Sequence, residues 1–188
     1  MPERVCPWWL GYLLASPLRK WISDNPERLL SPYVKEGMTV VEPGPGMGFF
    51  TLPLARIVGP AGRIIAIDIQ ARMLEGLRQR ADKAGLSDRI ETHLAQPDRM
   101  NLPALANAAD LVLAFAVLHE MPSAESFFME AAEMLKPGGL LYLAEPRGHV
   151  KAEAFAAEIE AARAAGLKFK EVPRPPARRC HAVILEKI

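Results

Sequence analysis

Three glycines, spaced two residues apart, follow a short β-branched run that ends in a carboxylate. Residues 39–48 read Thr-Val-Val-Glu-Pro-Gly-Pro-Gly-Met-Gly, with the acid at Glu42 and the glycines at Gly44, Gly46 and Gly48. Glycine is needed where the backbone adopts a positive φ or approaches a ligand closely, and a helix that starts there presents unpaired N–H groups. The segment therefore predicts a strand, a tight turn and a helix start that can hold a nucleotide-like ligand.

A second carboxylate, Asp68, ends the apolar run 63–68, about twenty residues beyond the glycines, where a carboxylate can accept hydrogen bonds from both hydroxyls of a ribose. Asp68 supports a ligand that contains a nucleoside, but a dinucleotide enzyme would use the same aspartate, so this position does not identify the ligand. A dinucleotide-binding fingerprint would require a third glycine at position 49, where the sequence has Phe49. The glycine spacing therefore departs from the dinucleotide pattern.

Alternating strand and helix patterns must position these residues. Strands are expected at 39–42, 63–68, 90–95, 110–116 and 140–145, and helices at 49–58, 70–84, 123–135 and 151–165. Two final strands, near 167–172 and 179–186, have a link too short for parallel neighbours. The order predicts a doubly wound, Rossmann-like α/β sheet of seven strands, five of parallel type plus a C-terminal hairpin, with its ligand at the carboxyl ends of the strands.

The composition fits one domain that is large enough for a real core. The chain has 188 residues, of which 50% are hydrophobic and 24% charged, and a net charge of +1, which gives no reason to expect nucleic acid or an anionic membrane as a partner. Residues 1–36 carry no strand pattern and predict a helical N-terminal extension, with short helices at 17–22 and 26–30, ahead of the main domain at 37–188.

No targeting or metal signal stands out. The apolar stretch 5–15 is too short to span a membrane and is interrupted by Pro7 and Gly11, so we expect a cytoplasmic protein without stable membrane insertion. Cys6 and Cys180 have no C-x-x-C spacing and are expected to be reduced thiols. His93, His149 and His181 are too scattered in the sequence to suggest a metal site, and no metal is expected.

The glycine motif, Asp68 and the turn Lys-Pro-Gly-Gly at 136–139 together resemble the class I S-adenosylmethionine-dependent methyltransferases. The resemblance covers roughly residues 37–187. Within that class the sequence is similar to the broad group of small-molecule enzymes that includes quinone-biosynthesis and arsenite methyltransferases. It implies S-adenosylmethionine as cofactor and S-adenosylhomocysteine as product. The three-cysteine arrangement of an arsenite enzyme is absent, since only Cys6 and Cys180 are available.

The resemblance also implies cofactor-binding roles at the strand ends. Asp68 would bind the ribose, and Ile69 would lie by the adenine. The acid that usually follows the third strand would accept a hydrogen bond from the adenine amino group. Its position falls on Gln96 when counted from Ile90 and on Asp98 when counted back from residues 102–103. The backbone at Phe115 and Ala116 would close over the cofactor. The amino-acid and ribose part would pack against the first turn, at Glu42, Gly44, Pro45, Gly46 and Gly48.

A sulfonium is already an activated methyl donor, so the protein mainly has to orient an acceptor and exclude water, and no general base is required. His119 is the tentative catalytic residue, because it can orient or deprotonate an acceptor. In the alternative reading, His119 caps or packs against the helix that follows. The expected partner is a small, apolar or aromatic substrate.

The N-terminal extension carries aromatic residues that suit a lid over the acceptor, although packing onto the sheet or a homodimer contact explains them equally well. These are Trp8, Trp9, Tyr12 and Trp21. Two other functions compete with a methyltransferase. A nicotinamide-dependent oxidoreductase would also use an acid at position 68 to bind a ribose, but this sequence has no Tyr-x-x-x-Lys pair for hydride transfer. A catalytically inactive cofactor-binding regulatory or partner subunit is the more serious alternative.

Overall fold

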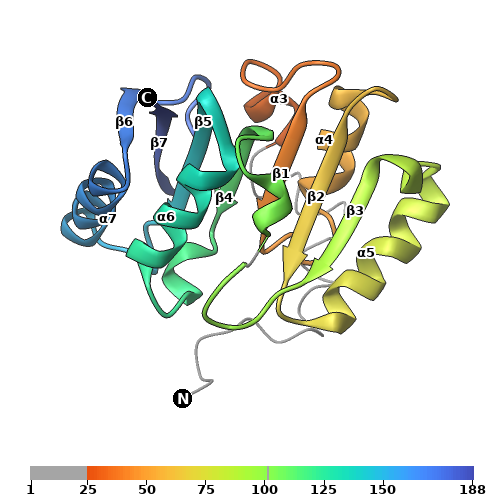
Figure 1. The fold of residues 1–188 in the computed structure, drawn as a ribbon, viewed down its shortest axis with the longest axis horizontal. Helices are drawn as coiled ribbons and strands as arrows, with labels where there is room; N and C mark the ends of the chain where they lie inside the picture. The colour runs from red at the N-terminus through yellow and green to blue at the C-terminus, as the bar shows by residue number, and fades with distance from the viewer. Residues whose placement is uncertain (1–24, 101) are drawn as a thin grey trace.

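A computed structural model of the protein describes residues 25–100 and 102–188 (Figure 1). The expected helix at 17–22, the four aromatic residues of the extension and Cys6 lie outside the described residues. The expected helix at 26–30 is present as α3 (Pro26–Leu30). Asn25 caps it, because its side chain accepts a hydrogen bond from the backbone N–H of Glu27 at 3.0 Å.

Seven strands form one sheet in the order β3-β2-β1-β4-β5-β7-β6. Strands β1 to β5 pair in parallel, whereas β7 runs antiparallel to both β5 and β6. The predicted five parallel strands and terminal hairpin are therefore confirmed, with β7 inserted between β5 and β6. The strands are β1 (Thr39–Pro43), β2 (Arg63–Asp68), β3 (Ile90–Leu94), β4 (Ala109–Phe115), β5 (Leu135–Pro146), β6 (Leu167–Glu171) and β7 (Cys180–Lys187).

Helices connect the parallel strands where the sequence pattern places them. They are α4 (Thr51–Val58), α5 (Ala71–Ala84), α6 (Ala124–Met134) and α7 (Ala152–Ala164), with 3-10 turns η1 (Ser87–Arg89), η2 (Pro103–Leu105) and η3 (Leu118–Glu120). Gly85 ends α5 in the left-handed conformation at φ 65°. The Ser123 hydroxyl caps α6 by accepting from the Ser126 N–H at 3.1 Å.

Alternate residues of each central strand enter two separate cores, one on each face of the sheet. Val40 and Leu111 pack with residues of α3, α4 and α5, whereas their neighbours Val41 and Val112 pack with residues of α6 and α7. Figure 1 shows α6 in front of the sheet and α4 behind it. Burial on both faces explains why these strands are almost continuously apolar in the sequence.

The Lys-Pro-Gly-Gly segment differs from the expected turn before a strand at residue 140. Strand β5 already begins at Leu135, and its register with β4 shifts from Ala109 opposite Leu135 to Leu111 opposite Leu140. The extra residues form a bulge in which Gly138 has φ 76°. Within residues 25–100 and 102–188, no helix is long and apolar enough to cross a membrane.

Candidate cofactor and active site

The turn between β1 and α4 has the backbone geometry that its glycines predict. Gly44, Gly46 and Gly48 have φ of 66°, 54° and 86°, in the left-handed region that other residues rarely adopt. The Gly44 N–H donates to the Ile67 carbonyl at 2.8 Å, which ties the turn to the end of β2. The guanidinium of Arg80 on α5 donates to the carbonyl of Met47 and holds the other side of the turn.

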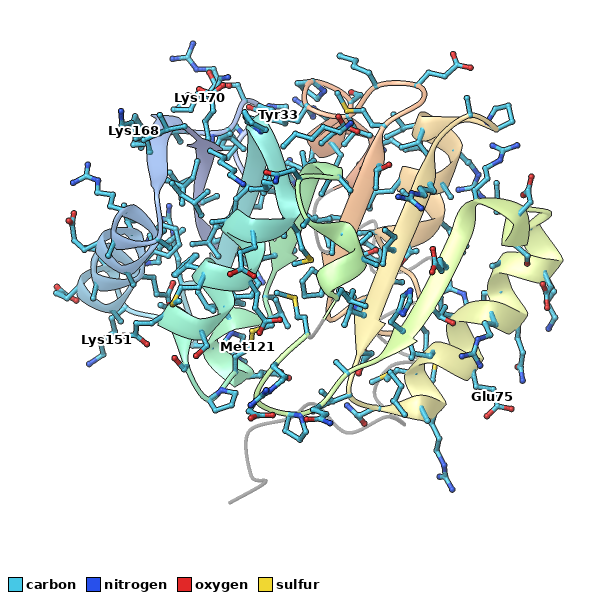
Figure 2. The ribbon with its side chains drawn as sticks, in the orientation of Figure 1. Tyr33, Glu75, Met121, Lys151, Lys168 and Lys170 are labelled. Atoms are coloured by element: carbon cyan, nitrogen blue, oxygen red, sulfur yellow. The ribbon has the colours of Figure 1, made fainter. Side chains whose placement is uncertain are left out.

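A cavity of about 170 Å³ opens beside this turn, at the carboxyl ends of the parallel strands. Figure 2 shows Met121, which lines the cavity, at the end of the molecule opposite Lys168 and Lys170. Parallel sheets of this type bind ligands at that end. Of the residues singled out in the sequence, the cavity brings together Gly44, Gly46, Asp68, Ile69, Gln96, Asp98 and Ala116.

The other predicted residues support the cavity from behind. Pro45 and Gly48 are buried in the turn, and Glu42 is only 3% exposed at the end of β1. Phe115 lies against Phe50, with ring centroids 4.4 Å apart. Gln96 and Asp98 both line the cavity and both are exposed, so each stays a candidate for contact with a base.

Asp68 ends β2 as a partly buried carboxylate whose geometry suits a hydroxyl-bearing ligand. Its Oδ1 accepts from the Gln70 N–H at 2.9 Å. Burial raises the pKa of Asp68 to about 6, and the negative charge of Glu120 adds to the rise, while backbone N–H groups of Gln70 and Gly46 oppose it. Asp68 is therefore mostly ionised at neutral pH and able to accept hydrogen bonds.

The cavity wall carries an excess of negative charge. Its carboxylates are Asp68, Asp98, Glu120 and Glu130, and its cation is Arg99, which pairs with Asp98 at 3.3 Å. This excess favours a cationic ligand and disfavours a pyrophosphate. It therefore fits a sulfonium better than a dinucleotide.

Glu42 is a buried carboxyl group directly beneath the turn. Burial raises its pKa to about 7, the charge of Asp68 contributes to the rise, and the Thr51 side chain partly offsets it. Its Oε2 atom is buried and has no hydrogen-bond partner among the described residues. An unpartnered buried carboxyl oxygen costs free energy, which a protonated carboxyl or a polar ligand atom would reduce.

The buried carboxyl makes stability depend on pH. With a pKa raised from 4.5 to about 7, protonated Glu42 contributes stability that is fully present below pH 4.5 and is lost as the pH rises through 7. We expect Glu42→Gln to raise the free energy of unfolding by about 3 kcal/mol at pH 8 and to change it little at pH 4. Urea denaturation at both pH values measures this, and an equal effect at the two would contradict it.

The segment after β4 closes the cavity on the side away from Asp68. Ala116 has φ 57°, unusual for a residue with a Cβ, and its N–H donates to the Ala144 carbonyl at 2.7 Å. The next side chain, Val117, packs so closely over Gly44 that a Cβ there would lie 2.5 Å from its Cγ2. The two walls of the cavity therefore meet at a position that only glycine fits.

His119 lies in η3, between the lining residues Val117 and Glu120, and does not itself line the cavity. It does not cap α6, which Ser123 does. Its Nδ1 instead contacts a carboxylate oxygen of Glu145 on β5. Sequence reasoning missed Glu145, and the signal that could have found it is a single acid at the end of an otherwise apolar strand.

The sheet order and the cavity together define the class: the fold is the Rossmann-like fold of class I S-adenosylmethionine-dependent methyltransferases. A family model described as "Methyltransferase domain" matches residues 34–174. The chain belongs to this methyltransferase domain family.

Relatives within the family are similar over part of their length. A ubiquinone biosynthesis O-methyltransferase of Methylocella silvestris is 31% identical over 135 residues, covering 72% of this chain and 50% of the relative. An arsenite methyltransferase of Aquipseudomonas alcaligenes is 28% identical over 62% of this chain and 35% of its own length. The chain thus spans about half or less of these curated relatives.

A solved structure matches over its whole length. The crystal structure of a S-adenosylmethionine-dependent methyltransferase from Aquifex aeolicus has a TM-score of 0.84 and 26% identity, and the match covers 98% of this chain and 100% of that one. S-adenosylmethionine is therefore the cofactor that the fold and family indicate.

Proposed function

We propose that this protein transfers the methyl group of S-adenosylmethionine to a small, apolar or aromatic acceptor. The observation that carries the proposal is the single cavity in which the glycine turn and the Asp68 carboxylate meet. When bound, the cofactor supplies an activated methyl group on a sulfonium. The similarity to a quinone-pathway O-methyltransferase supports an aromatic acceptor.

The chain's own residues would bind and orient the cofactor. Asp68 accepts from the ribose hydroxyls, Ile69, 38% exposed, packs on the adenine, and Gln96 or Asp98 accepts from the adenine amino group. The turn and the backbone at 115–116 exclude water from the reacting centre. Residues proposed to hold the amino-acid and ribose part are Glu42, Gly44, Pro45, Gly46 and Gly48.

Calorimetric titration with S-adenosylhomocysteine tests this proposal, and a separate titration with NADH tests the alternative of a dinucleotide-binding protein. We expect S-adenosylhomocysteine to bind and NADH not to bind. Asp68→Ala should weaken the binding by about 10- to 100-fold, because a charged hydrogen-bond acceptor is lost. The control is Asp88→Ala, since Asp88 is an exposed acid that pairs with Arg89 at 3.8 Å and does not line the cavity. Binding of NADH alone would refute the proposal.

Cofactor affinity should also depend on pH through Asp68. The pKa of this carboxyl is about 6, and the ionised form is the hydrogen-bond acceptor, so the contribution of Asp68 to affinity is expected to be complete above pH 7 and to fall as the pH drops through 6. At pH 5 the loss should be about 10-fold relative to pH 7. Asp68→Asn, titrated in the same buffers, should bind weakly and show a much flatter profile; an unchanged profile would contradict the assignment.

A catalytically inactive cofactor-binding partner subunit stays as the alternative, because a fold can be retained without its chemistry. Binding of S-adenosylhomocysteine without methyl transfer to any acceptor tested would favour that alternative.

A further inference from the structure

The backbone leaves the sheet abruptly at the end of β4. The N–H of Ala116 still donates to the Ala144 carbonyl of β5, at 2.7 Å. Ala116 then turns the chain with φ 57°, and η3 begins at Leu118. The turn takes the next backbone groups out of the sheet, and the first N–H groups of a helical turn have no partner within it. The N–H groups of Val117 and Leu118 therefore need an acceptor from another element.

The side chain of Glu145, one residue before the end of β5, is that acceptor. One of its carboxylate oxygens accepts from the N–H groups of Val117 and Leu118, at 3.1 and 2.8 Å. The Glu145 side chain is 0% exposed, so these hydrogen bonds are shielded from water. A buried carboxylate thus replaces the sheet partners that the backbone loses after Ala116.

Two histidines hold the other oxygen of Glu145 in place. Nδ1 of His119 contacts that oxygen, and Nε2 of His119 lies 3.1 Å from Nδ1 of His149. Both ring nitrogens of His119 are therefore engaged inside the cluster of Glu145, His119 and His149, and none of the three lines the cavity. The contacts of the cluster with the rest of the site run through the backbone of Val117 and Leu118.

The charges around His119 favour its protonated form, which compensates the negative charge of Glu145. The pKa of His119 is raised, first by the hydrogen bond with Glu145 and then by the charges of Glu145, Glu120 and Glu158, the last on α7, while burial opposes the rise. A buried carboxylate with a cationic partner and hydrogen-bonded oxygens avoids the cost of an isolated buried charge. An ionised carboxylate is also a stronger acceptor for backbone N–H groups than a neutral one.

The segment that Glu145 holds is one wall of the cofactor cavity. Ala116 and Val117 line the cavity, together with Gly44 of the glycine turn. Val117 packs so closely over Gly44 that a Cβ there would lie 2.5 Å from Cγ2 of Val117. Because the contact is this close, a change in the position of the Val117 backbone must change the shape of the cavity.

We propose that Glu145 is a positioning residue for the cofactor. Its carboxylate fixes the backbone of Val117 and Leu118, so that the wall after β4 stays closed against the glycine turn, and His119 supplies the compensating charge. This inference rests on the proposed function and deepens it, because it assigns part of the affinity for S-adenosylmethionine to a buried acid that lies outside the cavity lining.

Calorimetric titration of Glu145→Gln with S-adenosylhomocysteine tests the inference. Glutamine keeps the size of the side chain and a weaker acceptor oxygen, so we expect a folded protein whose affinity is about 5- to 10-fold lower. The matched control is Asp110→Asn. Asp110 also accepts a backbone N–H, that of Thr39 at 2.8 Å, but Thr39 begins β1 and so lies at the opposite end of that strand from the cavity.

Asp110→Asn should bind S-adenosylhomocysteine with native affinity, although its unfolding temperature should fall. A role of Glu145 in stability alone would make the two variants behave alike. Native affinity in Glu145→Gln, or an equal loss in both variants, would overturn the inference. If the native protein itself failed to bind S-adenosylhomocysteine, the proposed function would be refuted instead.

A double-variant cycle tests whether Glu145 acts through the cavity wall. Val117→Ala removes the side-chain atoms that meet the glycine turn, so in that background Glu145→Gln should cost less than about 2-fold in affinity. The same cost in both backgrounds would show that Glu145 does not act through Val117.

Amide resonances followed by NMR provide a readout that needs no cofactor. In Glu145→Gln the amide protons of Val117 and Leu118 should shift upfield and exchange with solvent at least about 10-fold faster, because a charge-assisted acceptor is lost. The amide proton of Thr39 should be unaffected in this variant. Unchanged shifts and exchange rates at Val117 and Leu118 would show that the carboxylate does not hold the segment.

Discussion

Gly44→Ala is expected to weaken S-adenosylhomocysteine binding by roughly 100-fold. The new methyl group would clash with a neighbouring side chain, and alanine is unfavourable at the positive φ of this position, so both effects distort the cofactor-binding turn. The added Cβ would lie 2.5 Å from Cγ2 and 3.1 Å from Cβ of Val117, so the turn and the segment after β4 must move apart. Both are walls of the cavity. Calorimetric titration measures the loss, and circular dichroism verifies that the variant is folded.

Two further variants separate the steric effect from backbone strain. Gly85→Ala has a similar φ of 65° and nothing within 4 Å of the added Cβ, so it should lose some stability and keep its affinity. Val117→Ala removes the Cγ2 atom that meets the new methyl group. We expect the Gly44→Ala, Val117→Ala double variant to recover about 10-fold in affinity, as contacting residues are non-additive. Strict additivity would show that Val117 is not the cause.

Gly139→Ala is expected to lower the free energy of unfolding by about 2 to 3 kcal/mol, the upper part of the range found when a packed site receives an extra group. Its Cβ would lie 2.8 Å from the Lys136 carbonyl oxygen and 3.1 Å from that of Ala109, and neither backbone group can rotate away. The bulge that sets the register of β5 against β4 would be strained. Thermal unfolding should show a midpoint lower by roughly 4 to 10 °C.

Gly138→Ala is the matched control in the same bulge. Its φ of 76° makes alanine unfavourable, but nothing lies within 4 Å of the added Cβ. The cost should therefore be only about 1 kcal/mol, from backbone conformation. If the two variants unfolded at the same temperature, the steric explanation for Gly139 would be wrong.

Much of the fold could be predicted because each element carries a local signal. Strand β2 was expected at 63–68 and is found there, since Ile64 to Ile67 are buried on both faces and read as a continuous apolar run. Helix α5 ends at Gly85 as expected, because only a left-handed residue closes that turn. The sequence predicts only a turn at 136–139 and not the bulge, since the register of the bulge depends on pairing with β4, a non-local contact.

The site residues could be predicted where a residue lies at the carboxyl end of a strand that the sequence pattern already identifies. Gly44, Gly46 and Asp68 meet in one cavity because β1 and β2 are parallel neighbours, and that pairing follows from the alternation of strands and helices. The cluster of Glu145, His119 and His149 carries no such signal. Its members come from different elements, and their contact depends on how β5 lies beside β4 and how η3 folds over it.

The position of β7 determines when the sheet can be completed during folding. Among the strands of the described residues, β6 pairs only with β7, and β7 lies between it and β5. While the chain is being synthesised, β6 emerges before β7 and has no strand with which to pair, although the five parallel strands can already associate. The outer part of the sheet, including the pairing of β7 with β5 that sets His181 opposite Glu145, therefore has to assemble last, in a chain made through Lys187.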